Sequence, residues 1–327
     1  MQAAYFDGMG PARDVLELGE VETPTPGPGE VLVRLRTSAV NPSDAKLRAG
    51  KRGDGRMPFA RIVPHSDGAG EIAALGAGVG DRQVGERVYI WNGQWQRPLG
   101  TCAQYIALPS QQAPRLPDAV DFRQGACIGI PVMTAQHCVF ADGPVAGQSV
   151  LVTGGGGRVG RYGVQLAKLG GARVIATVSN AEKAKLAESA GADAVLNYNE
   201  GDLARQVLTH APEGVERIVE VAFGANLETA LKVLKPGGTI ASYGSDQVMR
   251  PTFPFYDFMF KNATLRAVLV YLVEGEARAE MIAGLDETLA SGRLDFNIGE
   301  VHPLQEVAAA HEAVEAGAVG SVVIDIP

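Results

Sequence analysis

The fold is decided by the stretch Ser149-Val-Leu-Val-Thr-Gly-Gly-Gly-Gly-Arg-Val-Gly160. Its short apolar run predicts a buried strand, and the periodic segment 159–169 that follows predicts a helix. Gly155, Gly157 and Gly160 fit the pattern Gly-x-Gly-x-x-Gly, which permits a tight turn, close approach of a pyrophosphate to the backbone, and close packing of helix on strand. The helix would then direct its first amides and the positive end of its dipole at the phosphates. The stretch therefore predicts the phosphate-binding turn of a dinucleotide-binding domain.

The sequence after this turn alternates between strand and helix patterns. Further strands are predicted at 173–177, 194–197, 217–221, 239–243 and 265–271, with helices at 181–190 and 227–234. Strands separated by helices imply βαβ units, and therefore a parallel sheet with right-handed crossovers. With the first strand included, the pattern predicts an α/β domain with a doubly wound parallel sheet of about six strands.

The chain before about residue 116 is different in character. Short β-like runs at 31–36, 70–73 and 87–90 are broken by glycine and proline, which predicts a β-rich or barrel-like domain. A predicted helix at 278–289 and a strand at 321–326 have no place in the parallel sheet, so we expect them to return to the first domain. The expected domains are thus 1–122, completed by 272–327, and a dinucleotide-binding domain at 123–271.

Composition excludes several classes of protein. The apolar fraction of 46% is too high for a disordered chain, and the 41 glycines follow no three-residue period. Three distant cysteines cannot form a disulfide framework, and a net charge of −8 argues against a nucleic-acid partner. The first ten residues lack a targeting pattern, and no apolar run approaches the ~18 residues of a membrane span. We therefore expect a cytoplasmic protein that binds neither nucleic acid nor membranes.

The second strand of the alternation bears on the choice of cofactor. A site that prefers NAD usually has Asp or Glu at the end of this strand, where it binds the ribose 2′-hydroxyl. Here Val178-Ser-Asn180 follows the strand, and the nearest acid, Glu182, lies inside the next helix. Lys183 is placed to reach a 2′-phosphate, although an ordinary solvated helix residue is an equal alternative. The missing acid predicts NADPH.

With these motifs in place, the chain resembles the medium-chain dehydrogenase/reductase superfamily, and within it the quinone oxidoreductase or zeta-crystallin branch. The resemblance covers nearly the whole length. Its markers are Val40-Asn-Pro-Ser-Asp44, Pro64-His-Ser-Asp-Gly-Ala-Gly70, Val84-Gly-Glu-Arg-Val88, Gln124-Gly-Ala-Cys-Ile-Gly-Ile-Pro131, Thr134-Ala135, the glycine turn and Ala190-Gly-Ala-Asp193. It implies a GroES-like β-rich domain joined to a Rossmann domain. It also favours a homodimer paired at strand 265–271, whose apolar edge would otherwise be exposed.

The resemblance also implies which residues form the site. The cofactor-binding positions are Thr134, Gly155, Gly156, Gly157, Arg158, Val159, Gly160, Ser179, Lys183, Tyr198, Gly244, Ser245, Val268, Leu269 and Val270. Asn41 has the position of a polar residue in the active cleft, and it is the first candidate for stabilising an oxyanion. Lys46 is the second candidate, and it stands where relatives commonly have Tyr. Arg158 replaces a common Gly, and it either pairs with a phosphate or points to solvent.

The same comparison of motifs argues against a metal. The zinc ligands of metal-dependent relatives correspond here to Asn41, Ser66 and a position near Ile130, none of which is a good zinc ligand. His65 is one residue away from the expected position and would point elsewhere. The four closely spaced cysteines of the structural zinc lobe are missing. We therefore expect no metal.

The implied function is NADPH-dependent, zinc-independent transfer of hydride to a quinone or related conjugated carbonyl. An enoyl reductase acting on a C=C bond beside a ketone or thioester remains open, because the hydride chemistry is similar. A non-catalytic, crystallin-like NADPH-binding protein is the alternative from another class. The loop Trp91-Asn-Gly-Gln-Trp95 either lines an aromatic pocket or lies on the surface.

Overall fold

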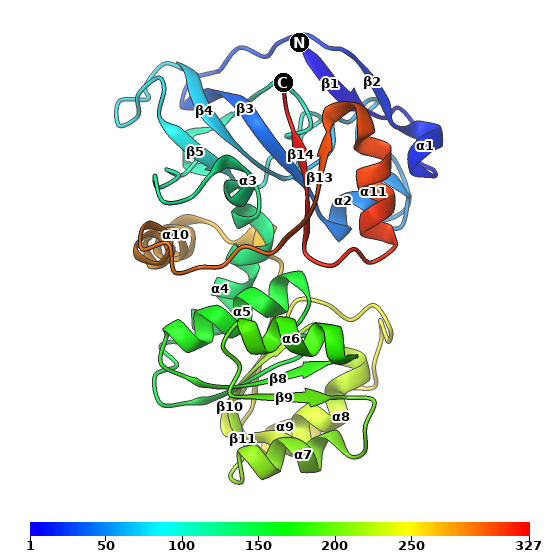
Figure 1. Ribbon diagram of the computed structural model, residues 1–327, viewed down its shortest axis with the longest axis vertical. Helices are drawn as coiled ribbons and strands as arrows, with labels where there is room; N and C mark the ends of the chain where they lie inside the picture. The colour runs from blue at the N-terminus through cyan, green and yellow to red at the C-terminus, as the bar shows by residue number, and fades with distance from the viewer. The chain divides into compact units, whose positions relative to one another are not determined.

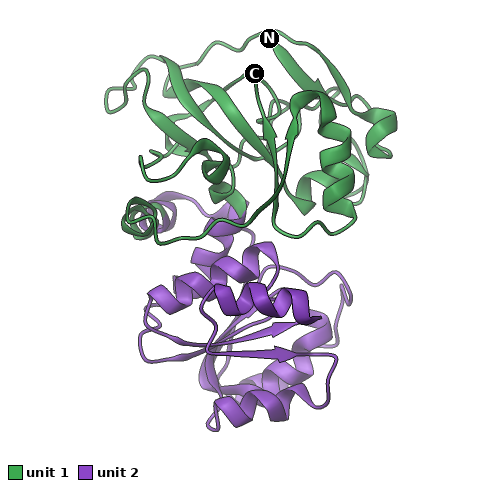
Figure 2. Ribbon diagram, in the orientation of Figure 1, with its two compact units in different colours: residues 1–130, 282–327 green, residues 131–281 purple.

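The computed structural model describes residues 1–327. The chain divides into two compact units, one formed by residues 1–130 with 282–327 and the other by residues 131–281 (Figure 2). Each unit has its own sheet and its own apolar core, and each is described by itself. The domain limits inferred from the sequence stay a prediction. No helix in either unit has the length and apolar character that crossing a membrane requires.

The second unit contains a six-stranded parallel sheet with helices on both faces (Figure 1). Its strands are β7 (Ser149–Val152), β8 (Arg173–Val178), β9 (Ala194–Asn197), β10 (Val215–Glu220), β11 (Leu234–Ser242) and β12 (Thr264–Ala267). Its helices are α4 (Met133–Phe140), α5 (Arg158–Leu169), α6 (Ala181–Ser189), α7 (Leu203–His210), α8 (Phe223–Val233) and α9 (Phe255–Phe260). The order across the sheet is β12-β11-β10-β7-β8-β9. This is the order of a Rossmann fold, so the predicted doubly wound sheet is confirmed.

The two faces of this sheet bury separate apolar clusters. Val150 and Val152 of β7 pack into a cluster with α5 and α6, whereas Leu151 packs into a second cluster with α7 and α8. Successive side chains of a strand point to opposite faces, so a strand covered on both faces is apolar throughout. This is why the run before the glycine turn is recognisable as a strand in the sequence.

In the second unit β12 differs from the sequence analysis at its end, and helices α4, α7 and α9 were not predicted. The strand predicted at 265–271 is wrong at its end, because β12 stops at Ala267 and Val270–Leu272 form a short 3₁₀ turn, η3. The amide of Val268 still donates to the Ser242 carbonyl and its side chain is buried, so the apolar run reflects burial beyond the strand. Helix α7 was not predicted, although Asp202 before it caps its first turn by accepting from the Arg205 amide.

The first unit is built around a mainly antiparallel sheet. Its strands are β3 (Glu30–Val40), β4 (Asp67–Leu75), β5 (Arg87–Ile90), β6 (Tyr105–Pro109), β13 (Ile298–Pro303) and β14 (Ser321–Asp325). Strands β1 (Gln2–Tyr5) and β2 (Glu17–Glu20) of this unit form a separate two-stranded sheet. Its helices are α1 (Ala12–Val15), α2 (Pro42–Arg48), α3 (Phe122–Gly125) and α11 (Val307–Glu315), with 3₁₀ turns at Ser110–Gln112 and Leu304–Glu306. A π-helical turn at Ile128–Val132 and helix α10 (Gly275–Ala290) cross the limits between the units along the chain. The sheet order is β13-β14-β3-β4-β5, with β6 also paired to β3.

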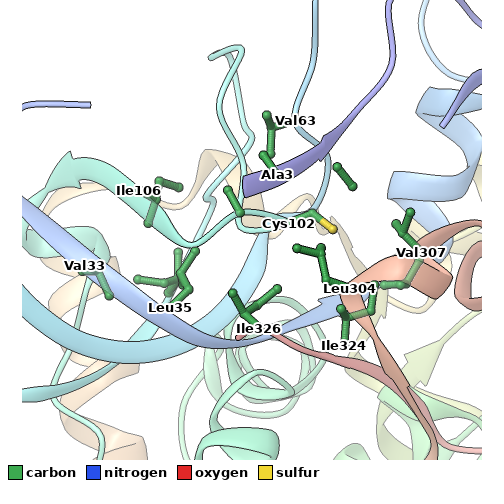
Figure 3. Close-up of a cluster of buried hydrophobic side chains, with 14 of the residues drawn as sticks. Ala3, Val33, Leu35, Val63, Cys102, Ile106, Leu304, Val307, Ile324 and Ile326 are labelled. Atoms are coloured by element: carbon green, nitrogen blue, oxygen red, sulfur yellow. The ribbon is translucent and has the colours of Figure 1, made fainter. Parts of the chain in front are cut away.

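Both ends of the chain contribute to the core of the first unit. Figure 3 shows Leu35 of β3 in one cluster with Leu304, Val307 and Ile324 from the C-terminal segment. Strand β14 lies antiparallel to β3, which joins the C-terminal strand to the N-terminal sheet. No local pattern indicates this pairing, because it joins segments at opposite ends of the sequence.

A buried chain of polar groups ties α11 to this sheet. The Nε2 atoms of His65 and His311 lie 2.9 Å apart, and His65 Nδ1 is 2.9 Å from Ser38 Oγ. Ser38 Oγ is in turn 2.8 Å from Thr101 Oγ1, which donates to the backbone carbonyl of Asp67 at 2.5 Å. One ring must donate and the other accept between the two Nε2 atoms, which two neutral imidazoles of opposite tautomer can do. Burial lowers the pKa of His65 well below its usual range, and nearby His311 acts in the same direction.

The neutral histidine pair makes stability depend on pH. Burial lowers the pKa of His311 to about 3, with nearby Arg48 acting in the same direction. The unfolded chain binds a proton at this imidazole below about pH 6.5, whereas the folded chain does so only near its lowered pKa. Stability contributed by a neutral His311 is therefore present above pH 6.5 and is lost as the pH falls toward about 3.

The substitution His311→Gln removes this titration and keeps a polar side chain. We expect the free energy of unfolding of the unmodified protein to fall more steeply than that of the variant, by about 1.4 kcal/mol per pH unit between about pH 6 and 4.5. Urea unfolding at several pH values measures both slopes. Parallel slopes in the two proteins would contradict the assignment.

Candidate functional site

The glycine turn lies where the order of strands in the second unit reverses. Strand β7 has β8 on one side and β10 on the other, and the chain passes first to β8 and only later to β10. At the carboxyl edge of the sheet, the loops that follow β7 and β10 therefore run to opposite faces of the sheet. Doubly wound sheets bind their ligands at this place.

Gly155 and Gly160 are required by packing within the turn. A Cβ atom on Gly155 would lie 2.7 Å from the Cβ of Ala176 on β8, which is too close for the turn to rest on the sheet. A Cβ on Gly160 would lie 2.2 Å from the carbonyl oxygen of Gly154. These two glycines let α5 approach the strands closely, as their spacing in the sequence predicts.

Gly156 and Gly157 form the outer part of the turn. A Cβ on Gly156 would lie 2.6 Å from both the Cβ and the carbonyl oxygen of Lys183 at the start of α6. Gly157 is exposed and is the N-cap of the 12-residue helix α5, and a Cβ there would approach only the Gly154 oxygen, at 3.2 Å. Bare backbone at a helix N-terminus, with amides that have no acceptor inside the helix, fits a pyrophosphate. The residues present therefore fit the phosphates of a dinucleotide, with Arg158 and Val159 opening the helix.

A buried acid, which the sequence analysis missed, holds the glycine turn in place. Glu220 Oε1 accepts from the Thr153 hydroxyl at 3.0 Å, the Ala222 amide at 2.5 Å and Asn226 Nδ2 at 2.9 Å. Thr153 Oγ1 also accepts from the amide of Val221 at 3.0 Å. Burial raises the pKa of Glu220, and the hydrogen bonds oppose this shift. The sequence carried a signal, since an acid at the end of a buried parallel strand needs a local partner.

The predicted positions for the adenosine phosphate lie at the ends of β8 and β9. Asn180 caps α6 by accepting from the Lys183 amide at 2.9 Å, and Asn199 Nδ2 donates to the Ser179 carbonyl at 2.9 Å. Tyr198 follows β9 and is exposed. Ser179, Lys183 and Tyr198 thus share one edge of the sheet, and the residues that end β8 include no carboxylate.

The loop after β11 is fixed by its own hydrogen bonds. A Cβ on Gly244 would lie 2.6 Å from the Val221 oxygen, so the loops after β10 and β11 are in close contact. The Ser245 hydroxyl accepts from the Gly224 amide at 2.9 Å and donates to the Val248 carbonyl at 2.6 Å. Because its side chain is committed to the loop, Ser245 would meet a ligand mainly through its backbone.

The remaining predicted cofactor positions are mostly buried. Thr134 lies in the first turn of α4, and Val268 and Val270 follow β12, all three with buried side chains. Leu269 between the two valines is exposed. Their roles as cofactor contacts stay predictions.

In the first unit, Asn41 is held by two acids. It is the N-cap of α2, and its backbone amide donates to Asp44 Oδ2 at 2.7 Å. Its side-chain Nδ2 donates to Asp67 Oδ2 at 2.8 Å, and all three residues are buried. An amide nitrogen has two hydrogens, so this bond fixes the direction in which the second one can be donated to an acceptor. Lys46, the other predicted catalytic residue, lies one turn further along α2 and is half-buried.

Asp67 is a second acid that the sequence analysis missed as a site residue. Burial raises the pKa of its carboxyl well above the usual range, and the hydrogen bond from Asn41 opposes the shift. Its Oδ1 has no hydrogen-bond partner, and a Cβ on Gly129 would lie 2.5 Å from that oxygen. The carboxyl therefore favours its protonated form. Its place in the marker 64–70 was the available signal.

Side chains of the metal-binding types are not grouped anywhere in the chain. No three or more His, Cys, Asp or Glu side chains are arranged so that they could hold a metal ion. The ring of His65 contacts Ser38 and His311, and the residue that follows it, Ser66, is buried.

Comparison with known proteins relates both units to one group of enzymes. Two family models match, one described as zinc-binding dehydrogenase over residues 159–287 and one as alcohol dehydrogenase GroES-like domain over residues 27–118. A quinone oxidoreductase of Pongo abelii is 31% identical over 326 residues, which cover 98% of this chain and 95% of that protein. A solved mycobacterial protein complexed with NADPH has a TM-score of 0.86 and 29% identity, with 100% of each chain covered. A solved NAD-dependent alcohol dehydrogenase has a TM-score of 0.89 and 28% identity, also with 100% of each chain covered.

The steric roles of two neighbouring glycines make a matched test of the turn. Gly157→Ala should fold, because a φ of −85° suits alanine and its Cβ would have one close neighbour, the Gly154 oxygen at 3.2 Å. Its methyl group would crowd the exposed backbone, and we expect affinity for a dinucleotide to fall about tenfold, the effect of losing a hydrogen bond to a charged group. Gly156→Ala should instead destabilise the fold by about 1–3 kcal/mol through overpacking. Thermal unfolding and fluorescence titration separate the two effects, and unchanged affinity in folded Gly157→Ala would refute the phosphate assignment.

Proposed function

Because the chain belongs to the medium-chain dehydrogenase/reductase superfamily, as an enzyme similar to quinone oxidoreductases, we propose that it reduces a quinone or related conjugated carbonyl with NADPH and without zinc. The observation that carries the proposal is the pair Asn41–Asp67, with a donor–acceptor distance of 2.8 Å. By the motif resemblance, Asn41 stands at a zinc-ligand position of metal-dependent relatives. Here the position holds a neutral amide whose direction a buried carboxyl fixes.

The residues of the second unit would hold the cofactor, which supplies the hydride when bound. The glycine turn and the first turn of α5 would bind the pyrophosphate. Ser179, Lys183 and Tyr198 would bind the adenosine phosphate, and Thr134, Gly244–Ser245 and Val268–Val270 would face the nicotinamide. These residues would bind and orient the cofactor, and the structural neighbour complexed with NADPH supports the choice of NADPH.

Asn41 has the chemistry that a metal-free reductase requires. Addition of hydride to a conjugated carbonyl leaves negative charge on oxygen, and a preorganised hydrogen-bond donor stabilises that charge in the transition state. The hydrogen bond to Asp67 fixes the position of Asn41 Nδ2. The amide is neutral, so it has no charge that would attract the hydride supplied by the cofactor. Lys46 on the same helix is the alternative donor.

Asn41→Ala should lower kcat/KM for the best acceptor about 10²–10³-fold, which is the usual effect of losing one oxyanion donor. Asp67→Asn keeps the shape but disturbs the direction of the Asn41 amide, so we expect a smaller loss in kcat/KM. Steady-state oxidation of NADPH measures both variants, and fluorescence titration should show unchanged cofactor affinity. An unaltered kcat/KM in Asn41→Ala would move the role to Lys46, which Lys46→Met then tests. Dialysis against a chelator should leave the rate unchanged.

We propose NADPH over NADH because the end of β8 presents an amide and a lysine where an acid would select the 2′-hydroxyl. Lys183→Ala should weaken NADPH binding about fivefold to tenfold and leave NADH binding unchanged, since only the former has a phosphate there. Lys185→Ala, an exposed lysine on the same helix, is the matched control and should change neither affinity. Tighter binding of NADH than of NADPH by the unmodified protein would overturn the assignment.

The substrate class is decided by parallel assays. NADPH oxidation with a quinone, a small enone and an enoyl thioester separates a quinone reductase from an enoyl reductase, because the two share their hydride chemistry. NADPH binding without turnover on any of the three would support the non-catalytic, crystallin-like alternative.

We also propose a homodimer formed through β12 and α9. Strand β12 is the edge of its sheet and pairs only with β11. Leu265 on this strand is 38% exposed, and on α9 Phe255, Tyr256 and Phe260 are exposed, the last of them by 78%. An edge strand beside exposed aromatic side chains is an interaction surface, and a second copy would extend the sheet.

Leu265→Lys should convert the dimer into a monomer, because it places a charge in the apolar interface. Leu18→Lys changes an equally exposed leucine on β2 of the first unit and should leave the dimer intact. Sedimentation velocity at micromolar concentration measures both. A monomeric unmodified protein would rule out the interface.

A further inference from the structure

The backbone of His65, just before β4, has a conformation that residues with a side chain rarely adopt. Its φ is +79°, in the left-handed region, and the residue is fully buried. This conformation costs free energy for any residue with a Cβ, so a histidine that is held in it points to a role for its side chain. The hydrogen bonds of the imidazole indicate that role.

The hydrogens in the polar chain from His311 to Asp67 can be placed one by one, starting at the Asp67 end. Thr101 Oγ1 lies 2.5 Å from the Asp67 carbonyl oxygen, which has no hydrogen, so the threonine hydroxyl is the donor. That hydroxyl has only one hydrogen. The 2.8 Å contact between Thr101 and Ser38 is therefore made by the hydrogen of Ser38. Ser38 Oγ is then the acceptor toward His65 Nδ1, which lies 2.9 Å away.

This order of donors fixes the tautomers of both histidines. His65 has its hydrogen on Nδ1, so its Nε2 is an acceptor. His311 Nε2, which lies 2.9 Å from that atom, must therefore carry a hydrogen. The ring centroids are 5.0 Å apart and the ring planes differ by 28°, so the two nitrogens meet along the ring edges. His311 Nδ1 is left as a bare, buried nitrogen with no hydrogen-bond partner, and the charge of nearby Arg48 opposes its protonation.

The chain ends at the two strand ends that carry the proposed oxyanion donor. Ser38 lies on β3, three residues before Asn41, and Asp67 is the first residue of β4. Ala39 is paired with Asp67 in the sheet, and the Asp67 side chain accepts from Asn41 Nδ2 at 2.8 Å. The hydrogen bonds that start at His65 therefore hold the backbone on both sides of the Asn41–Asp67 pair.

Thr101 connects the histidine ring to these strands in a closely packed position. Its side chain is fully buried, and a Cβ on Gly68 of β4 would lie only 2.9 Å from the Thr101 Cβ. The Thr101 amide also donates to the His65 carbonyl at 3.0 Å. Thr101 is thus fixed by His65 on one side and by β4 on the other, so its hydroxyl has a defined direction toward the Asp67 carbonyl.

We propose that His65, in the Nδ1–H tautomer set by His311, is a positioning residue for Asn41. It acts through Ser38 and Thr101, which hold the end of β3 and the start of β4. This inference rests on the proposed function, because the position of Asn41 affects turnover only if its amide stabilises the oxyanion. A hydrogen bond weakens steeply as its angle departs from linear, so a small displacement of the amide reduces that stabilisation.

Imidazole ¹⁵N chemical shifts test the tautomers directly, because a nitrogen that carries a hydrogen differs from a bare one. In protein labelled with ¹⁵N-histidine at neutral pH, we expect His65 to carry its hydrogen on Nδ1 and His311 on Nε2. The variants His65→Asn and His311→Gln assign the two sets of signals, and asparagine tolerates the left-handed backbone at position 65. The reverse tautomers, or a doubly protonated ring, would contradict the inference.

Thr101→Val removes the hydroxyl from the chain and keeps the shape of the side chain. We expect kcat for the best acceptor to fall about tenfold, with KM and NADPH affinity unchanged, because the oxyanion donor is displaced. Thr101→Ser keeps the hydroxyl and should restore most of kcat. Thr37→Val is the matched control, since the buried Thr37 hydroxyl donates to the Phe122 carbonyl at 2.6 Å from the opposite face of β3. It should leave kcat unchanged.

A double-mutant cycle shows whether the effect passes through Asn41. In the Asn41→Ala background, Thr101→Val should cause no further loss of kcat, because the positioned group is already absent. Additive losses, an unchanged kcat in Thr101→Val, or an equal loss in Thr37→Val would overturn the positioning role. Each of these results leaves the proposed reduction of a conjugated carbonyl intact.

A measurement without turnover separates this inference from the proposed function. In ¹H–¹⁵N spectra the side-chain amide of Asn41 gives a pair of signals, identified by their absence from Asn41→Ala. Thr101→Val should shift this pair, and Thr37→Val should leave it in place. A pair that stays in place in Thr101→Val overturns the inference whether or not the protein reduces any acceptor. A failure to oxidise NADPH with a quinone, an enone and an enoyl thioester, with the pair shifted as expected, counts against the proposed function alone.

Discussion

The burial of the Asp67 carboxyl is the constraint on which the first unit depends. Its backbone carbonyl accepts from Thr101 and so ends the chain of polar groups that begins at His311. Its side chain accepts from Asn41. A buried carboxyl costs free energy unless it is hydrogen-bonded or neutral, and here burial shifts its pKa toward the neutral form. The same residue therefore joins the core that the two ends of the chain build to the amide of Asn41, the proposed oxyanion donor.

In the second unit, Glu220 is likewise a buried acid that is stabilised by local hydrogen bonds. This buried acid also stands at the end of a strand, and its hydrogen bonds hold Thr153, the residue that precedes the glycine turn. Glycine makes the turn close enough to the sheet for phosphate binding, but it also increases the freedom of the backbone. The carboxylate limits that freedom from the neighbouring loop. In both units a buried acid fixes a group that we propose contacts a ligand, either directly or through the neighbouring turn.

The sequence was sufficient for the parts of the fold that depend on local pattern. The glycine spacing and the fully apolar strands identified the Rossmann unit, because a strand that is covered on both faces is apolar along its whole length. The end of β12 was misjudged, since burial continues past the strand at Val268 and the two causes of an apolar run cannot be distinguished locally. The pairing of β14 with β3, the histidine contact and the Asn41–Asp67 bond join distant residues, so no spacing along the chain could show them. The motif identifies Asn41 itself, whereas its bond to Asp67 appears only when the chain is folded.

Recognition and catalysis make different electrostatic demands on this site. An acidic protein repels an anion at long range, but at physiological salt charges more than ~8 Å apart are largely screened, so the nearest groups decide. Asn41, at the N-cap of α2, supplies a donor without charge. A neutral donor forms a stronger hydrogen bond as negative charge develops on the acceptor oxygen in the transition state. A cation binds a substrate that is already anionic equally well in the ground state and in the transition state, so it raises only the affinity for the substrate. On the proposed assignment, the neutral amide at the N-cap of α2 is therefore the group that gives selectivity for the transition state.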